Sequence, residues 1–323
     1  MMHADYLLNT TADNFEARAL ELFHYQYAHV EIYRKYVDLL NRPEPTCLTE
    51  IPFLPISFFK SEQILDVNQT SFDLHFQSSG TGNEGRSQHF VADKSWYETS
   101  FTLGFHHFFG PVEAYTILAL LPNYLEQGSS SLVYMVDSLI KQSRQPLSGF
   151  LLNNPMELVS RYKEAKKNGG KVLIFGVSYA LLDLAEQQID LSEAIIVETG
   201  GMKGRRKELT KAQLHEELKS GLGISNVYSE YGMTELLSQG YSMKDGKFDV
   251  VPWMKILIRD PYDPFQFFSE GKSGGINVID LANQHSCAFI QTQDLGRMDG
   301  DGFYIEGRFD DADIRGCNLL LPQ

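Results

Sequence analysis

The chain has 323 residues, a length that allows one large domain or two domains of ordinary size. Hydrophobic residues make up 43% of it and aromatic residues 12%, so the composition supports a large folded core and excludes intrinsic disorder. The 42 acidic and 28 basic residues give a formal net charge of −14, which argues against a general nucleic-acid partner because phosphate backbones need a cationic face. The net charge does not exclude a local basic pocket that binds one small anion.

Cysteine content and the start of the chain indicate the compartment. Cys47, Cys287 and Cys317 are too few and too scattered for a disulfide framework or a metal site. The first residues lack the charged and apolar regions of a signal peptide, and the apolar stretches 115–122 and 171–182 are too short or too interrupted to cross a bilayer. We therefore expect a cytoplasmic protein with no membrane span.

From the start of the chain, apolar residues recur at helical spacing over 13–40 and predict one long helix with Thr11 or Asp13 as its N-cap. An extended, proline-punctuated run follows at 51–60. From residue 72 strand-like and helix-like stretches alternate, which is typical of an α/β fold with a mostly parallel sheet flanked by helices. The strand-like stretches are 74–78, 88–92, 115–121, 171–175, 194–197 and 224–229. The helix-like stretches are 93–108, 130–142, 155–168, 178–188 and 208–220.

After about residue 240 the pattern changes to short alternating strands separated by Gly and Asp. The tetrapeptides at 244–247 and 299–302 have the composition of hairpin turns. This part of the chain therefore predicts a smaller β-rich subdomain.

The first candidate site is the glycine-rich segment SSGTGNEGR at 78–86. Gly80, Gly82 and Gly85 fit the dinucleotide-binding spacing, but the strand-like RSQHFVA follows where a helix is needed, and no acidic residue lies about 20 positions further on. The kinase and Walker patterns are missing as well. The segment is then either an anion site, built from backbone N–H groups, hydroxyls and Arg86, or an ordinary hairpin loop.

The second candidate site is YSEYGMTE at 228–235, which follows a strand-like stretch. Thr234 offers a hydroxyl and Glu235 a carboxylate at an expected strand end, the edge where open α/β sheets bind ligands. A carboxylate beside polyphosphate oxygens is a usual ligand of Mg²⁺. The alternative is a surface turn that leads into a helix.

The third candidate site is TQDLGRMDGDGFYIEGRFDDAD at 292–313. Asp294 follows an apolar strand, and a carboxylate there suits two ribose hydroxyls, each of which needs an acceptor. Arg308 follows a hairpin and can reach a phosphate as a fork donor. The alternative is a solvated acidic hairpin.

Taken together and in this order, the three segments resemble motifs of the adenylate-forming superfamily, which includes acyl-CoA synthetases, peptide-synthetase adenylation domains and luciferases. SSGTGNEG is similar to its Ser/Thr/Gly-rich ATP loop, YGMTE to its Tyr-Gly-x-Thr-Glu motif, and TQDLGRMDGDGFYIEGRFDD to its Thr-Gly-Asp-Leu-Gly…Gly-Arg-x-Asp-Asp stretch. Gln293 departs from this pattern, where the family usually has Gly. The resemblance implies the large N-terminal domain of that fold, with an α/β region at 1–240, a β-rich subdomain at 241–310 and a short tail at 311–323.

The resemblance also implies roles for individual residues. Thr234 contacts the α-phosphate or the acyl carboxylate, Glu235 ligates Mg²⁺, and Asp294 binds the ribose hydroxyls. Arg308 contacts phosphate or ribose, and Tyr231 stacks on the adenine ring. The remaining nucleotide-binding positions lie in the glycine-rich segment and at a Gly-Gly turn: Ser78, Ser79, Gly80, Thr81, Gly82, Arg86, Gly200 and Gly201. ATP and Mg²⁺ are the implied cofactors.

Four further segments, IPFLPISFFK, LPNYLEQGSSSLVYMVD, ETGGMKGRRKEL and RGCNLLLPQ, resemble acyl-protein synthetases, the LuxE-like long-chain-fatty-acid–protein ligases of bacterial fatty-acid reductase complexes. The implied reaction is attack of a fatty-acid carboxylate on the α-phosphorus of ATP, release of pyrophosphate, and transfer of the acyl group to a protein or carrier thiol. The implied partner is an acyl reductase or an acyl-carrier protein. Two alternatives stay open: an acyl- or aryl-CoA ligase of the phenylacetate type, with CoA as acceptor, and a non-catalytic nucleotide- or acyl-binding subunit of a reductase complex.

One histidine and one cysteine carry open alternatives. His106, beside His107 at the end of an aromatic-rich helix, either gates the acyl pocket or packs as a structural residue. Cys317 is either an acyl acceptor on a flexible tail or a small apolar residue, while Cys47 and Cys287 are expected to be structural.

The small mobile C-terminal domain of the family, with its lysine, is expected to be absent, because this sequence ends thirteen residues beyond Asp310 and has no lysine after Lys272. The basic cluster of Lys203, Arg205 and Arg206 is the candidate substitute for that cation. Its alternatives are contact with an acidic partner surface and plain solvation.

Overall fold

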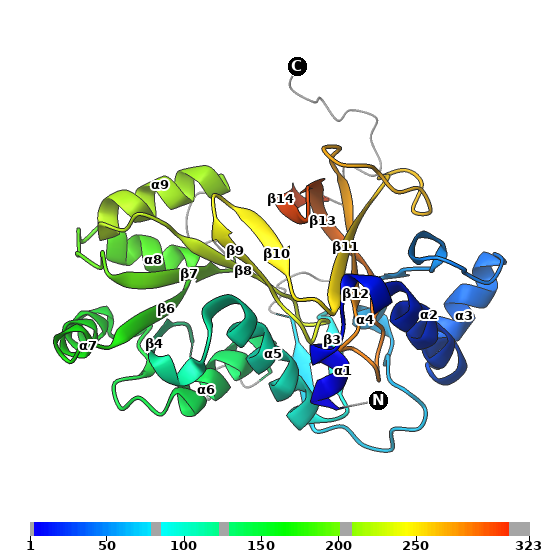
Figure 1. Cartoon of the computed structure of the whole chain (residues 1–323), viewed down its shortest axis with the longest axis horizontal. Coiled ribbons are helices and arrows are strands. Elements are labelled where there is room, and N and C mark those ends of the chain that lie inside the picture. Colours follow the sequence, from blue (N-terminus) through cyan, green and yellow to red (C-terminus); the bar gives the residue numbers. More distant parts are fainter. Residues whose placement is uncertain (1–2, 79–84, 123–128, 201–208, 310–323) are drawn as a thin grey trace.

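The computed structural model describes residues 3–78, 85–122, 129–200 and 209–309. Most of these residues form one large sheet that is flanked by helices. The helices from the start of the chain lie near the β11–β12 end of this sheet (Figure 1). The helices are α1 (Ala4–Leu8), α2 (Ala12–His29), α3 (Glu31–Leu40), α4 (Phe58–Ser61), α5 (Lys94–Phe109), α6 (Ser131–Ser143), α7 (Pro155–Lys167), α8 (Ser178–Ala185) and α9 (Lys211–Leu222). Two short 3₁₀ helices are η1 (Leu48–Glu50) and η2 (Val112–Ala114).

Twelve described strands make up the large sheet, in the order β11-β12-β13-β14-β10-β9-β8-β7-β6-β4-β5, with β1 beside β13. They are β1 (Leu54–Pro55), β4 (Tyr115–Leu120), β5 (Gly149–Phe150), β6 (Lys171–Val177), β7 (Ala194–Thr199), β8 (Tyr228–Tyr231), β9 (Gly240–Lys244), β10 (Lys247–Val250), β11 (Met254–Arg259), β12 (Gly274–Asp280), β13 (Phe289–Asp299) and β14 (Gly302–Arg308). A separate antiparallel pair is formed by β2 (Leu74–Gln77) and β3 (Gln88–Val91).

The pairing of neighbouring strands changes once, from parallel to antiparallel, along the main path of the sheet. Strands β5, β4, β6, β7 and β8 pair in parallel, and from β8 to β9 and onward to β11 every pair is antiparallel. This agrees with the predicted α/β fold that carries a β-rich part toward its end. The change lies beside the predicted boundary at residue 240, although the sheet itself continues across it; the division into regions stays a prediction.

The parallel strands are covered on both faces, which explains why their sequences are continuous apolar runs. All six residues of β4 are buried, and β6 is exposed only at Lys171. Figure 1 shows α8 and α9 on one face of these strands and α5 and α6 on the other. The carboxyl ends of β7 and β8 therefore meet at one edge of a buried sheet.

The predicted helix over 13–40 is wrong in one respect, because the structure divides it into α2 and α3 at Val30. Val30 has extended backbone angles (φ −105°, ψ 98°) and a side chain that is almost fully buried. The N–H of Val67 donates to the carbonyl of His29, at 2.8 Å, where a continuous helix would need that carbonyl for itself. A contact from a segment 38 residues further on thus ends α2. Thr11 is the N-cap of α2, as predicted.

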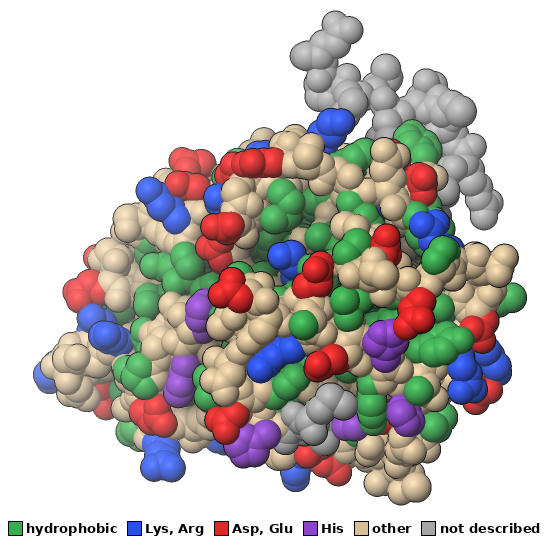
Figure 2. Space-filling view, turned by 45° about the vertical axis from the view of Figure 1, so that its right-hand side comes forward, with side chains coloured by type: hydrophobic (Ala, Val, Ile, Leu, Met, Phe, Trp, Pro, Cys, Tyr) green, Lys and Arg blue, Asp and Glu red, His purple; other side chains and the backbone are tan. Residues whose placement is uncertain are grey.

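Both predicted hairpin turns are confirmed. Asp245 and Gly246 connect β9 to β10 with positive φ angles of 55° and 73°, and Gly300 (φ 57°) lies in the turn between β13 and β14. Acidic and basic side chains are interspersed over the face in Figure 2, so on that face the negative charge is not gathered into one patch. Among the described residues, no helix combines the length and apolarity that a membrane span requires.

Candidate active site

Two predicted site segments lie side by side at the carboxyl ends of β7 and β8. The parallel register pairs Val197 with Tyr228 and Glu198 with Ser229, so Gly200 and Tyr231 leave the sheet at the same edge. Gly200 has φ +71°, a conformation that favours glycine, and its carbonyl accepts a hydrogen bond from Ser178 Oγ at 3.1 Å. Gly201 lies outside the described residues.

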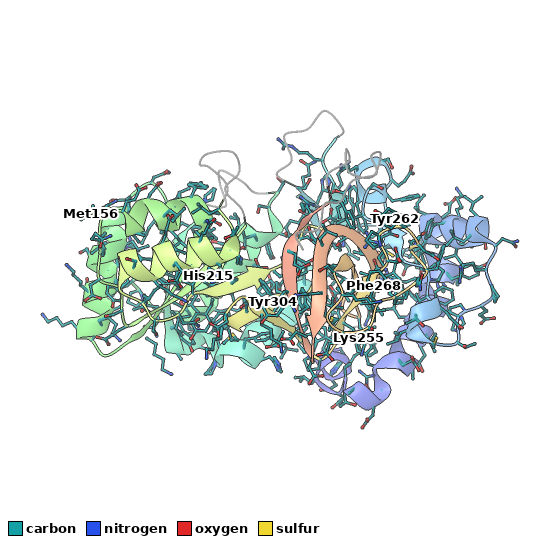
Figure 3. The ribbon with its side chains drawn as sticks, turned by 90° about the horizontal axis from the view of Figure 1, so that it is seen from above. Met156, His215, Lys255, Tyr262, Phe268 and Tyr304 are labelled. Atoms are coloured by element: carbon teal, nitrogen blue, oxygen red, sulfur yellow. The ribbon has the colours of Figure 1, made fainter. Side chains whose placement is uncertain are left out.

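Tyr231 and Asp294 are joined directly. The Tyr231 hydroxyl donates to Asp294 Oδ2 at 2.9 Å, and the tyrosine ring packs edge-on against Phe248 and Phe303. Figure 3 looks down on this part of the molecule: β13 and β14, with the labelled Tyr304, lie between α9, with the labelled His215, and the N-terminal helices. The β-rich part of the sheet therefore brings Asp294 back beside the end of β8.

Arg308 completes this group. Asp294 and Arg308 are cross-strand partners in β13 and β14, and Arg308 Nε lies 3.2 Å from Asp294 Oδ1. The Asp294 side chain is only 14% exposed whereas that of Arg308 is 67% exposed. Among the described residues, Tyr231 thus binds one oxygen of the Asp294 carboxylate and Arg308 the other. Because the Arg308 guanidinium is exposed, an incoming ligand can bind to it or displace it.

The electrostatics of Asp294 reflect two opposed effects. Burial raises the pKa of its carboxyl, and the Arg308 guanidinium and the Tyr231 hydroxyl oppose that shift. The pairing thus favours the ionised form, which has the acceptor oxygens that two ribose hydroxyls need. The bulge beside Leu295 and Gly296 interrupts the ladder at this point, as bulges often do next to binding sites.

Glu235 lies within the same electrostatic environment. Its side chain is 4% exposed, and burial raises the pKa of its carboxyl, while a hydrogen bond from the Ser87 side chain and the charge of Arg308 oppose the shift. The charge of Asp294 also acts on Glu235. The structure therefore brings Tyr231, Glu235, Asp294 and Arg308 together, with Thr234 beside them.

Three side chains that the sequence patterns missed hold the turn between β8 and β9. His89 Nδ1 lies 2.8 Å from the carbonyl of Thr234, and Asn283 Nδ2 donates to the carbonyl of Glu235 at 2.8 Å. Asp280 Oδ2 accepts from the N–H groups of Leu237 and Ser238, at 2.8 and 2.9 Å. All three side chains are almost completely buried, so the backbone of the motif is fixed from behind. The turn leads into strand β9, not into a helix.

The glycine-rich segment connects β2 to β3, which confirms the strand–loop–strand interpretation and excludes the dinucleotide-binding one. Ser78 and Ser87 close the hairpin: Ser78 N–H donates to the Ser87 carbonyl, and Ser87 N–H donates to Ser78 Oγ, both at 3.0 Å. Arg86 is exposed. Because His89 of β3 contacts Thr234, the hairpin lies beside the Thr234–Glu235 turn. The other predicted loop residues, Ser79, Gly80, Thr81 and Gly82, lie outside the described residues.

The structure does not bring His106 to this group. His106 is exposed at the end of α5, and its Nε2 accepts from the N–H of Val112 at 3.4 Å, just before β4 begins. That is the amino-terminal edge of the parallel strands, whereas Thr234 and Glu235 follow the carboxyl end of β8. Cys287 is buried and burial raises the pKa of its thiol to about 12, consistent with a structural residue. Cys317 and the cluster of Lys203, Arg205 and Arg206 lie outside the described residues.

The donor set fits Mg²⁺ only as a partner of phosphate. The described residues contain no group of three or more His, Cys, Asp or Glu side chains arranged to hold a metal ion by themselves. Glu235 offers one buried carboxylate at the predicted position. Mg²⁺ in phosphate sites commonly uses one or two carboxylates and takes its other ligands from phosphate and water, so a single carboxylate is compatible with the ion.

Comparison with known proteins gives structural matches only. No family model matches the sequence, and no curated protein matches it. An open conformation of 2-hydroxyisobutyryl-CoA ligase in complex with 2-HIB-AMP and CoA is 12% identical with a TM-score of 0.68, covering 91% of this chain and 74% of that one. ATP-bound MatB from Rhodopseudomonas palustris is 17% identical with a TM-score of 0.56, covering 75% of this chain and 50% of that one. The chain thus spans about half the length of the MatB structures. At this identity the likeness establishes the fold, and the chain has the predicted fold of the adenylate-forming enzymes.

Proposed function

We propose that the protein activates a carboxylic acid with ATP and passes the acyl group to a thiol. A carboxylate oxygen of the acid attacks the α-phosphorus, the bond to the bridging oxygen breaks, and pyrophosphate leaves. The thiol sulfur then bonds to the acyl carbon, its proton is lost, and AMP leaves. The observation that supports this proposal is the convergence of Tyr231, Glu235, Asp294 and Arg308 at one edge of a sheet whose fold is shared with ATP- and acyl-AMP-bound structures.

Each residue of the group has a role that its surroundings allow. Asp294 binds the ribose hydroxyls, since its largely buried carboxylate is paired with the exposed Arg308, which a ligand can reach. Arg308 contacts phosphate or ribose, and Tyr231 borders the base. Attack of one anion on another needs charge neutralisation and alignment more than a general base, which suits a site that holds an arginine.

The phosphate end of the site is assigned to the β2–β3 hairpin and the Thr234–Glu235 turn. Ser78 and Arg86, with the loop residues between them, contact the β- and γ-phosphates, and Thr234 contacts the α-phosphate or the acid. Glu235 would hold Mg²⁺, which when bound neutralises phosphate charge. His89 and Asn283 keep the carbonyls of Thr234 and Glu235 in place, so both side chains present a fixed geometry to ATP.

We further propose which acid is activated and which thiol accepts the acyl group. The resemblance to acyl-protein synthetases favours a fatty acid and a protein or carrier thiol, with a reductase or acyl-carrier protein as partner and Cys317 as an intermediate acceptor. CoA as acceptor fits the same chemistry and is favoured by the CoA complex of the similar 2-hydroxyisobutyryl-CoA ligase. Mass spectrometry after incubation with ATP and acid separates the two acceptors: acyl on Cys317 that is lost in Cys317→Ser supports the first, and acyl-CoA formation supports the second.

Acid-dependent exchange of labelled pyrophosphate into ATP tests the activation step. We expect exchange with at least one acid of a panel, and a loss of about 100-fold or more in Glu235→Gln. Glu306→Gln is the matched control, because this exposed carboxylate lies on the same strand as Arg308 but pairs with Arg297. The proposal is wrong if the protein binds ATP yet no acid supports exchange, or if Glu235→Gln exchanges as fast as Glu306→Gln.

A further inference from the structure

One face of strands β7, β8 and β9 carries a row of polar side chains next to the proposed site. Glu230 and Tyr241 are direct cross-strand partners, and the parallel register places Thr199 beside Glu230 on β7. Thr199 Oγ1 donates to Glu230 Oε2 at 2.6 Å. Because side chains alternate along a strand, these three residues share the face that α5 covers, where the rings of Phe108 and Phe109 pack on Tyr241.

The row contains a buried hydroxyl group, that of Tyr241, to which no described residue forms a hydrogen bond. Tyr241 is 1% exposed, and its hydroxyl has no hydrogen-bond partner among the described residues. Burial raises the pKa of Glu230 to about 7, and the charge of Glu230 helps to raise the pKa values of Tyr241 and Tyr97, so the carboxyl and both hydroxyls lie within electrostatic reach of one another. A buried polar group without a partner is destabilising, so this arrangement favours a polar ligand.

The row also lies beside the turn to which the proposed function assigns Thr234. Glu230 directly precedes Tyr231, and its Oε1 lies against the backbone of Gly232, where a Cβ atom would collide with it. Gly232 is two residues before Thr234, which the proposed function places at the α-phosphate or at the acid carboxylate. With Thr234 at the acid carboxylate, a group attached close to that carboxylate lies near Glu230, whose cross-strand partner is Tyr241.

Resting on the proposed function, we infer that Thr199, Glu230 and Tyr241 bind a hydrogen-bond-donating substituent of the acid, so that the substrate is an amino or hydroxy acid and not an unsubstituted fatty acid. An ammonium or hydroxyl group donates to the Glu230 carboxyl, whose other oxygen Thr199 already holds, and the hydroxyl of Tyr241 gains a partner. An alkyl chain in the same place would offer no hydrogen bond to either Glu230 or Tyr241. This inference departs from the fatty acid that the resemblance favours.

Pyrophosphate exchange with matched acids tests the inference. The panel compares hexanoate with 2-hydroxyhexanoate and 2-aminohexanoate, so that only the substituent differs. We expect kcat/KM to be higher for one substituted acid by about tenfold or more, since a site built to bond a donor discriminates against the analogue that lacks it. Preference for the amino acid identifies an ammonium as the donor, and preference for the hydroxy acid identifies a hydroxyl.

Two variants locate the selectivity. Tyr241→Phe and Glu230→Leu are expected to reduce the preference, the second to about one or below. Ser242→Ala is the matched control, because Ser242 is the buried neighbour of Tyr241 on the opposite face of β9, and it should keep the wild-type preference. The inference is overturned if hexanoate is the best acid in the wild type, or if both variants keep the wild-type preference. Failure of every acid to support exchange would instead reject the proposed function.

Discussion

His89 links the stability of the protein to pH through the turn that carries the site. Burial lowers the pKa of its imidazole from 6.5 to about 4, against the opposing effect of its hydrogen bond to the Thr234 carbonyl. The unfolded chain therefore binds more protons than the folded one between these values, so stability falls as the pH falls from 6.5 toward 4. Integrated from about pH 7.5 to about pH 4.5, this single residue removes about 2–3 kcal/mol from the free energy of unfolding.

Urea unfolding of the wild type and His89→Gln at both pH values measures this contribution. At about pH 7.5 the variant should be the less stable protein, because it loses a buried hydrogen bond. At about pH 4.5 the difference should have moved in favour of the variant by about 2–3 kcal/mol, whatever other groups titrate in both proteins. His107→Gln, a substitution of an exposed histidine at the end of α5, should keep the wild-type pH dependence. A stability difference between wild type and His89→Gln that does not change with pH would refute the reasoning.

Three further substitutions probe the framework of the site. Asp280→Ala leaves the N–H groups of the motif turn without an acceptor and should lower the free energy of unfolding in urea by about 3 kcal/mol or more; an unchanged midpoint would contradict this. Phe289→Ala removes a fully buried ring that packs with three other aromatic rings and should cost about 3–5 kcal/mol in the same assay. Arg259→Met removes a buried positive charge that lowers the pKa of Asp294, so the pH at which ATP binding is lost should rise, and an unshifted profile would exclude this electrostatic role.

Local patterns predicted most elements of the fold because the forces that define them are local. Strand β4 and helix α7 begin at or within two residues of their predicted starts, since continuous apolar runs and an Asn-Pro helix start are read from neighbouring residues. The break at Val30 could not be predicted in this way, because it depends on a hydrogen bond between His29 and Val67. The continuity of one sheet from β5 to β11 depends on pairing between distant strands and was likewise not visible.

In the candidate site too, residues in local motifs could be predicted from the sequence and residues that act through long-range contacts could not. Tyr231, Thr234, Glu235, Asp294 and Arg308 lie in short motifs and could be named from them. The residues that hold these motifs could not, because their contacts join parts of the chain far apart: His89 lies 145 positions from Thr234, and Asn283 lies 48 from Glu235. His106, for which the resemblance suggested a gating role, lies apart from this group, and its Nε2 accepts from the N–H of Val112 ahead of β4.

The central claim is that an acid oxygen becomes bonded to the α-phosphorus of ATP, and isotope transfer tests this most directly. The protein is incubated with ATP, a thiol acceptor and an accepted acid carrying ¹⁸O in both carboxylate oxygens, and the AMP released is analysed by mass spectrometry. An acyl-adenylate places one acid oxygen between carbon and phosphorus, and thiol attack at the carbon leaves that oxygen on AMP. The account predicts AMP that carries one ¹⁸O atom. Acyl transfer accompanied by unlabelled AMP, or by ADP in place of AMP, would contradict it.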